Sequence, residues 1–126
     1  NDNSKDGTLN GFQQLSLEIP TLVYFTNPGP NGFGYAVRYG LERFSGDCVA
    51  VFMADMSDDP EDLVRYYRKM QEGDYDAVFG SRWIRGGRVI DYPQLKKYIN
   101  RVANLVIRLL MGISYNDTTN AFKLYK

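Results

Sequence analysis

The sequence predicts an α/β fold: a mostly parallel sheet with helices on both faces. Predicted strands alternate along the chain with segments of helical periodicity, which is typical of such folds. The segment from Cys48 to Ala54 is apolar throughout and ends at an aspartate, as expected for a strand that is buried on both faces. The 126 residues are enough for one domain with a sizeable core.

The chain starts with turn-forming residues, N-D-N-S-K-D-G-T. Because a folded domain rarely begins inside a loop, we expect at least one strand of the domain to precede Asn1. A short helix is predicted next and ends at Pro20; the apolar residues at helical spacing are Leu9, Phe12 and Leu15. The apolar segment 22–26 then predicts a strand.

A loop rich in glycine and proline, N-P-G-P-N-G-F-G, leads into a predicted helix over residues 35–44. Its small residues, Gly34 among them, would let a ligand or another backbone approach closely. Glycine-rich turns between a strand and a helix can bind phosphate. This loop has neither the G-x-G-x-x-G pattern nor the lysine of a P-loop, so a plain turn is the alternative interpretation.

Three aspartates follow the central apolar segment. In an open α/β sheet, ligands bind beyond the carboxyl ends of the strands, which is where Asp55 stands. A carboxylate there can meet a metal ion bound to phosphate, because Mg²⁺ and Mn²⁺ prefer oxygen ligands. Asp58 and Asp59 have a simpler interpretation, because they precede Pro60 and two acids, the pattern of a helix start. We therefore predict a helix over residues 60–72.

A second predicted strand, over residues 76–80, also ends in polar residues, Ser81 and Arg82. Both strands would deliver these residues to one edge of the sheet, so we expect Arg82 at the same edge as Asp55. The guanidinium group of arginine binds phosphate through two parallel hydrogen bonds. We therefore predict a functional role for Arg82, although an arginine in a loop is often only solvated.

The longest predicted helix runs from Pro93 to about Met111. Its apolar residues recur at helical spacing: Leu95, Ile99, Val102, Val106 and Leu109. A polar stripe follows the same rhythm elsewhere on the helix: Lys97, Arg101, Asn104 and Arg108. Two interpretations stay open: a core helix with a solvated stripe, or a helix at a membrane surface where the cations meet lipid phosphates. The polar cluster around Asp117 that follows can be an Asx or Ser/Thr turn.

Composition excludes several classes of function. Acidic and basic residues balance, so the chain has no overall charge to attract nucleic acid. There is no histidine, which removes the commonest general base. Cys48 is the only cysteine, so no internal disulfide can form, which fits a reducing compartment. No apolar run is long enough to span a membrane.

Six motifs in the same order resemble the family 2 inverting glycosyltransferases, which have the Rossmann-like GT-A fold. Within that family the chain is similar to the polyprenyl-phosphate sugar transferases of the dolichol-phosphate mannosyltransferase type. The motifs are D-N-S-K-D-G-T, N-G-F-G-Y-A-V-R-Y-G, M-A-D-M-S-D-D-P-E-D-L, G-S-R with a later G-G, N-R-V-A-N and D-T-T-N-A-F-K-L-Y. The resemblance covers residues 1–126 as a single catalytic domain and implies that the domain is truncated at both ends.

The resemblance also implies roles on the donor side. The residues that would bind the nucleotide sugar are Asp2, Asp6, Gly34 and Asp55, with Asp2 in the pocket of the nucleotide base. The metal ion on the diphosphate, Mg²⁺ or Mn²⁺, would be bound by Asp55 and Ser57. The metal motif of the family has two aspartates, but Met53 holds the first position here. Since a thioether is a poor ligand for these ions, metal dependence is expected to rest on Asp55 or to be weak.

On the acceptor side, the resemblance implies that Arg82 and Lys96 meet the acceptor phosphate and that Asp117 lines the site. Asp55, Arg82 and Asp117 would then form the catalytic group. Lys96 stands where the family has an arginine, which keeps the charge but loses the bidentate fork. Three further positions also depart from the family pattern: Asn120, Ala121 and Lys123.

The resemblance implies transfer of a sugar, with inversion, from a nucleotide-diphosphate sugar to a polyprenyl phosphate such as dolichyl or undecaprenyl phosphate. That acceptor is already an anionic nucleophile, so it needs no general base, in keeping with the lack of histidine. The expected partners are the nucleotide sugar, the lipid and a membrane surface, and the expected location is peripheral, at the cytoplasmic face. Two alternatives stay open: transfer to a hydroxyl of a glycan or another acceptor, and a nucleotide-sugar-binding relative without turnover, which Met53 favours.

Overall fold

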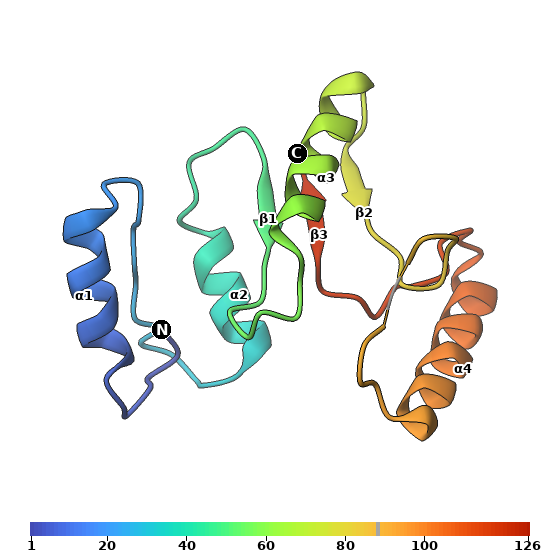
Figure 1. The fold of residues 1–126 in the computed structure, drawn as a ribbon, viewed down its shortest axis with the longest axis horizontal. Helices are drawn as coiled ribbons and strands as arrows, with labels where there is room; N and C mark the ends of the chain where they lie inside the picture. Colours follow the sequence, from blue (N-terminus) through green and yellow to red (C-terminus); the bar gives the residue numbers. More distant parts are fainter. Residues whose placement is uncertain (88) are drawn as a thin grey trace. The chain divides into compact units, whose positions relative to one another are not determined.

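A computed structural model describes residues 1–87 and 89–126 of the chain (Figure 1). Over these ranges there are four helices and three strands. In chain order they are α1 (Thr8–Glu18), α2 (Phe33–Leu41), β1 (Val49–Val51), α3 (Pro60–Glu72), β2 (Ala77–Phe79), α4 (Gln94–Met111) and β3 (Lys123–Tyr125). The predicted α/β class is confirmed. The chain divides into two compact units, Asn1–Gly46 and Asp47–Lys126, each with its own internal contacts.

Two helices and the segment between them make up the first unit. α1 begins after Asp6, whose Oδ1 accepts a hydrogen bond from the backbone N–H of Thr8 at 3.0 Å. α2 begins after Gly32, whose φ of 136° is a conformation that glycine adopts without strain. Both predicted helices are confirmed, and α2 begins and ends slightly earlier than the predicted range 35–44.

The strand predicted over residues 22–26 is not formed as a strand. Two backbone hydrogen bonds join it to the start of the chain: Asn1 N donates to Phe25 O at 2.8 Å, and Asn27 N donates to Asn1 O at 2.9 Å. This is the bonding pattern of two parallel strands. A strand needs a neighbour along its length, and within the described ranges only Asn1 pairs with this segment. The prediction is therefore wrong for the described chain.

The second unit contains a three-stranded sheet in the order β1-β3-β2 (Figure 1). Both pairings are antiparallel, so β1 and β2 run in the same direction on either side of β3. The sheet described here thus differs from the mostly parallel sheet that was predicted. The reason is that the C-terminal segment, which was not predicted as a strand, returns as β3 between the two predicted strands.

The core of this unit lies where α3 packs against β2 and β3. Phe122 and Leu124 are 4% and 3% exposed. The rings of Phe52 and Tyr66 pack on the ring of Phe122, with centroids 5.3 and 4.6 Å away. β1 covers only residues 49–51 of the predicted strand, and its residues are partly exposed. Burial on both faces was therefore a wrong prediction: α3 packs against β2 and β3, and β1 is one of the two edge strands of the described sheet.

The start of α3 follows the predicted capping pattern. Asp59 is the N-cap, and its Oδ1 accepts a hydrogen bond from Glu61 N at 2.9 Å. Pro60 occupies the first turn, where it lacks only an N–H that would be unsatisfied anyway. Asp58 does not cap the helix; its Oδ2 accepts a hydrogen bond from Met53 N at 3.2 Å and so closes the loop between β1 and α3.

α4 presents its faces in the opposite way to a core helix. Its polar residue Asn104 is 2% exposed, whereas Leu95 and Leu109 are each 73% exposed and Leu110 is 80% exposed. The interpretation as a core helix is therefore wrong, and of the polar stripe Asn104 is buried whereas Arg101 and Arg108 are exposed. The helix ends at Gly112, whose left-handed conformation is the usual C-terminal signal. None of the described helices has the length and apolar character needed to cross a bilayer.

Leu124 should contribute strongly to the stability of the second unit, because it is buried in the central strand. We expect Leu124→Ala to lower the free energy of unfolding by about 2–5 kcal/mol, through lost apolar contact and a residual cavity. Leu110→Ala is the matched control, since that leucine is 80% exposed and its removal should change the value by no more than about 0.5 kcal/mol. Denaturant unfolding followed by circular dichroism measures both. Equal effects of the two substitutions would contradict the burial described here.

Candidate active site

β1 and β2 end on the same side of the sheet, at its carboxyl-terminal edge. Val51 and Phe79, the last residues of the two strands, are both opposite Lys123 of β3. Asp55 follows β1 by four positions and Arg82 follows β2 by three. The register therefore agrees with the expectation that the two residues leave the sheet at one edge. No hydrogen bond or ion pair joins Asp55 to Arg82 within the described parts of the chain.

Arg82 and Asp117 form a bidentate ion pair at this edge. Arg82 Nη2 donates to Asp117 Oδ1 at 2.6 Å, and Arg82 Nε donates to Asp117 Oδ2 at 2.9 Å. The backbone N–H of Arg82 donates to the same Oδ2 at 2.9 Å. Asp117 is fully buried, whereas the Arg82 side chain is 26% exposed. The buried carboxylate thus fixes the orientation of a partly accessible guanidinium group.

This environment changes the protonation of its neighbours. Hydrogen bonding to Asp117 raises the pKa of Arg82 above its ordinary value, and Tyr92 adds a smaller effect in the same direction. Burial, together with the nearby carboxylates, raises the pKa of Tyr66 to about 12. Burial lowers the pKa of Lys123, whose Nζ donates to Thr118 O at 2.9 Å. Arg82 therefore stays charged and Tyr66 stays neutral at neutral pH.

Asn104 of α4 connects the helix to the segment that carries Asp117. Its Oδ1 accepts hydrogen bonds from Thr118 Oγ1 at 2.8 Å and from Thr119 N at 3.2 Å. Its Nδ2 donates to Thr119 Oγ1 at 3.0 Å and to Asn100 O at 2.9 Å. Because Asn104 is buried and uses both ends of its amide, it holds the Asp117 segment in one position relative to α4.

The segment after β2 is tied to the segment before β3 by further hydrogen bonds. Gly80 O accepts from the hydroxyl of Tyr115 at 2.5 Å and from Asn120 Nδ2 at 3.2 Å. Ser81 Oγ donates to Asn116 Oδ1 at 2.7 Å. A Cβ at position 80 would lie 1.5 Å from the hydroxyl of Tyr66, so a glycine is needed unless that ring moves. The hydrogen bond from Ser81 to Asn116 gives Ser81 a structural role next to the Arg82–Asp117 pair.

Asp55 lies in a short exposed turn after β1. Its Oδ1 accepts a hydrogen bond from Ser57 N at 3.0 Å, and the intervening Met56 has a positive φ of 63°. Hydrogen bonds from the Ser57 side chain and backbone lower the pKa of Asp55, so the carboxylate is ionised at neutral pH. Ser57 thus orients Asp55.

The residues present fit a divalent ion only in part. No group of three or more acidic, cysteine or histidine side chains that could hold a metal ion is found in the part of the chain that the structure describes. Asp55 offers one carboxylate oxygen beyond the one bonded to Ser57 N. Mg²⁺ is commonly bound by one or two carboxylates together with the phosphates of a substrate, so Asp55 fits an ion that arrives with a diphosphate.

Three residues of the first unit were predicted to bind the nucleotide sugar. Asp2 and Asp6 accept hydrogen bonds from within the unit, whereas Gly34 has open space around it. Asp2 accepts hydrogen bonds from Gly32 N at 2.6 Å and from Asn27 Nδ2 at 2.8 Å, and these bonds lower its pKa. Asp6 accepts from the hydroxyl and the N–H of Thr8. A Cβ at Gly34 would meet nothing within 4 Å, so no close contact explains a glycine there.

Lys96, predicted to meet the acceptor phosphate, is exposed on the first turns of α4. Its Nζ lies 5.4 Å from the centre of the Tyr92 ring. The same tyrosine contributes to the raised pKa of Arg82. Tyr92 is therefore close to both cations, Lys96 and Arg82.

Sequence reasoning missed two buried asparagines, Asn27 and Asn104, which are 5% and 2% exposed. Asn104 had been grouped with the cations of the polar stripe. One signal was present: asparagine is a poor helix former, so its position within a long helix indicates a contact that only its side chain can make. Asn27 precedes a proline and was taken as part of a loop.

The whole described site lies within a stretch that matches a known family. The model of glycosyl transferase family 2 matches residues 1–126. The chain belongs to this family. The family membership predicted from the six motifs is thus confirmed.

Three curated relatives are similar to the chain. An undecaprenyl-phosphate mannosyltransferase of Micrococcus luteus is 30% identical, over 99% of this chain and 52% of the relative. A polyprenol monophosphomannose synthase of Mycolicibacterium smegmatis is 33% identical, over 99% and 48%. A dolichol-phosphate mannosyltransferase of Pyrococcus furiosus is 32% identical, over 87% and 31%. The chain therefore spans about half or less of the length of these relatives.

The Arg82–Asp117 pair should matter far more to stability than an ion pair at the surface. We expect Asp117→Ala to lower the free energy of unfolding by about 3–5 kcal/mol, because it leaves a partly buried guanidinium group without its partner. Asp74→Ala is the control: Asp74 pairs with Lys126 at 3.0 Å, but its side chain is 95% exposed, and its loss should change little. Thermal unfolding of the two variants and the wild type makes the comparison. A mild effect of Asp117→Ala would show that the pair does not hold the site together.

Proposed function

We propose that the chain transfers a sugar, with inversion, from a nucleotide-diphosphate sugar to a polyprenyl phosphate. The observation that carries the proposal is the pair of groups at one sheet edge. Asp55 follows β1 as an exposed, ionised carboxylate, and Arg82 follows β2 as a cation that a buried carboxylate orients. The three relatives, whose names describe transfer of mannose to or from such lipid phosphates, support the same class of acceptor.

On the donor side, Asp55 would hold a Mg²⁺ or Mn²⁺ ion that is bound to the diphosphate. Such an ion stabilises the negative charge that develops on the leaving diphosphate. Ser57 would act by orienting Asp55 through the hydrogen bond described above. In the first unit, Asp2 and Asp6 would act by shaping the loops around the nucleotide, because their oxygens accept hydrogen bonds from Gly32, Asn27 and Thr8.

On the acceptor side, Arg82 would bind the lipid phosphate with the part of its guanidinium group that Asp117 does not use. Asp117 engages Nε and Nη2, which leaves Nη1 as the nitrogen that Asp117 does not use. Lys96 would add a second cation. The acceptor phosphate attacks the anomeric carbon as an anion, so the chain needs no general base, and it contains no histidine to act as one.

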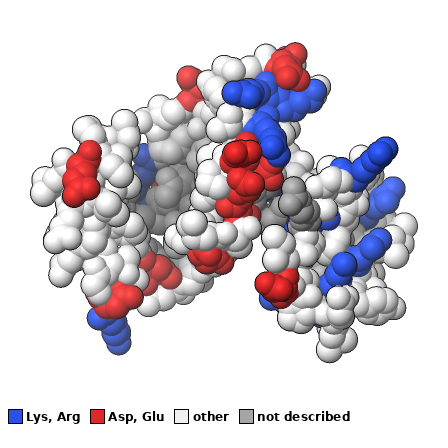
Figure 2. Space-filling view, viewed as in Figure 1, with Lys and Arg blue, Asp and Glu red and all other residues white. Residues whose placement is uncertain are grey.

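α4 would lie at the membrane surface that carries the acceptor. Its sequence contains two lysines and two arginines and no acid: Lys96, Lys97, Arg101 and Arg108. In Figure 2, Lys and Arg side chains gather on the right of the view, where Figure 1 places α4. The exposed leucines of the same helix supply apolar surface. Cations beside exposed apolar residues are the composition of a helix at an anionic bilayer surface.

The role of Asp55 can be tested by removing its charge at constant shape. We expect Asp55→Asn to lower kcat/KM for sugar transfer by at least about a hundredfold, because the metal ion would lose the carboxylate that is proposed to bind it. Asp47→Asn, an equal change at an exposed aspartate, should have no effect. The measurement is transfer of labelled sugar to a polyprenyl phosphate by the full-length protein with Mg²⁺ or Mn²⁺, from whichever of a panel of nucleotide-diphosphate sugars the wild type uses. Unchanged turnover in Asp55→Asn would refute the donor site.

The role of Arg82 can be tested with Arg82→Lys, which keeps a charge that can pair with Asp117 but loses Nη1, the nitrogen that would meet the phosphate. Losing one hydrogen bond to a charged phosphate should raise the KM for the lipid acceptor by about ten- to a hundredfold. The KM for the nucleotide sugar should change much less. Initial rates at varied acceptor, with the donor saturating, and then the reverse, separate the two. If the loss falls on donor affinity instead, Arg82 binds the diphosphate and the acceptor assignment is wrong.

A further inference from the structure

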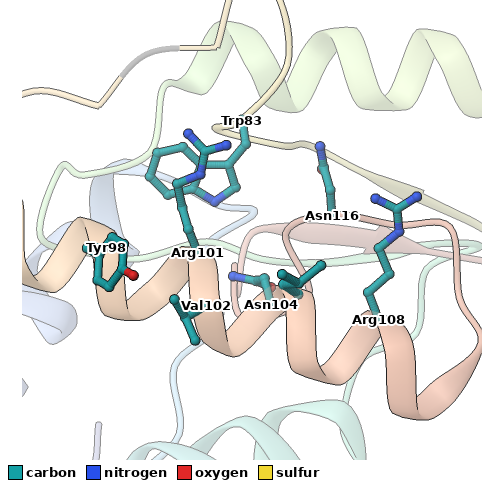
Figure 3. Close-up of a pocket in the computed structure, with 8 residues that line it drawn as sticks. Trp83, Tyr98, Arg101, Val102, Asn104, Arg108 and Asn116 are labelled. Carbon is teal, nitrogen blue, oxygen red and sulfur yellow. The ribbon is translucent and has the colours of Figure 1, made fainter.

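Three cations surround the indole ring of Trp83, next to the Arg82–Asp117 pair. The guanidinium carbons of Arg82 and Arg101 lie 5.5 and 5.7 Å from the centre of the ring, and Lys97 Nζ lies 5.9 Å from it. Figure 3 shows Arg101 rising from α4 towards Trp83. Lys97 and Arg101 are four residues apart, so they lie on the same side of the helix. One aromatic side chain thus gathers charges from two separate segments of the chain.

Within the part of the chain that the structure describes, only one of these three cations has an acidic partner. Asp117 pairs with Arg82, whereas no ion pair to Lys97 or Arg101 is formed there. A cation–π contact holds a cation in place without neutralising its charge. Because like charges close to one ring repel each other, an anion among them would relieve that repulsion.

A pocket of about 440 Å³ lies beside the ring, and its lining is of two kinds. Trp83 and Arg101 line one part of it; Val102 and Leu105, which are 43% and 52% exposed, supply apolar surface to another. A ligand that contacts both parts carries an anionic group next to a hydrocarbon chain. A nucleotide sugar has no such chain, whereas a polyprenyl phosphate has its first isoprene unit bonded directly to the phosphate. The pocket therefore fits the acceptor of the proposed reaction.

We propose that Lys97 and Arg101 bind the same acceptor phosphate as Arg82. The first isoprene units of the acceptor then lie along the apolar part of the pocket. Trp83 is a positioning residue, because its ring keeps the three cations together. A phosphate monoester carries close to two negative charges at neutral pH, which matches the two cations without an acidic partner in the described ranges. The inference rests on the proposed function in one respect, the chemical class of the acceptor, and adds the residues that bind it.

Binding of a short, soluble prenyl phosphate tests the two cations of α4 without a membrane. Citronellyl phosphate is titrated calorimetrically into the full-length protein, with no sugar donor present. We expect Lys97→Gln and Arg101→Gln each to raise its Kd about ten- to a hundredfold, because each removes a hydrogen bond to a charged oxygen. Arg68→Gln, an equal loss of charge on exposed α3, is the matched control and should bind as the wild type does.

Two substitutions of Trp83 separate positioning from packing. Phenylalanine keeps an aromatic face for the cations, and it loses no hydrogen bond, because the buried indole N–H has no acceptor within the described ranges. We expect Trp83→Leu to raise the Kd for citronellyl phosphate about tenfold and Trp83→Phe to bind nearly as the wild type does. If both variants bind equally weakly, the ring acts only by packing and the positioning role is wrong.

The apolar part of the pocket is tested with Val102→Ser. This change should raise the Kd for citronellyl phosphate about three- to tenfold, since apolar contact with the chain is lost. Binding of methyl phosphate, which has no isoprene chain, should stay as in the wild type. The side chain is already partly exposed, so the substitution leaves the fold intact.

Three outcomes would overturn the inference. The first is wild-type affinity in both Lys97→Gln and Arg101→Gln. The second is equal affinity of the wild type for citronellyl and methyl phosphate, which would leave the chain without a site. The third is a raised KM for the nucleotide sugar in these variants, with that for the acceptor unchanged, which would place the cations at the diphosphate. Conversely, binding that depends on Lys97 and Arg101 in a wild type that transfers no sugar to the prenyl phosphate would support this inference and refute the proposed function.

Discussion

The hydrogen-bonded pair of Arg82 and Asp117 organises the second unit. A carboxylate with no exposure at all is costly unless every oxygen is paired, and here both oxygens accept bonds from Arg82. The pair therefore requires that the end of β2 and the segment before β3 approach closely. That approach brings Lys123 to the middle of the sheet edge and places an oriented guanidinium group there. The charge that would bind a phosphate is positioned by the same contact that joins two distant segments.

α4 depends on this arrangement. Asn104 is buried because it satisfies Thr118 and Thr119 next to Asp117. Turning that side of the helix inwards exposes leucines such as Leu109 on the other side. Exposed apolar surface of this extent usually marks a site of interaction. The polar contacts around Asp117 thus also determine which face of α4 stays exposed.

The first unit shows the same use of a carboxylate as a structural contact. Asp2 bonds to Gly32 N at the start of α2 and to the buried Asn27, so one side chain joins the beginning of the chain to the loop before the helix. Family members are expected to bind nucleotide near this turn. In this chain the aspartate would therefore influence nucleotide binding through the shape of the loop. Direct contact with the base is not required for the residue to matter.

The sequence by itself determined the features that depend on near neighbours. The cap of α3 at Asp59, the length of α4 and the polar residues after β1 and β2 follow from contacts within a few positions, and six local motifs identified the family. Only the tertiary structure decided the rest. Arg82 and Asp117 are 35 positions apart, and nothing in either local pattern shows that they pair. The antiparallel strand β3 and the buried face of α4 likewise depend on which distant segments meet. Periodicity shows that a helix has two different faces; which of them is buried depends on the hydrogen bonds that a residue such as Asn104 finds elsewhere in the chain.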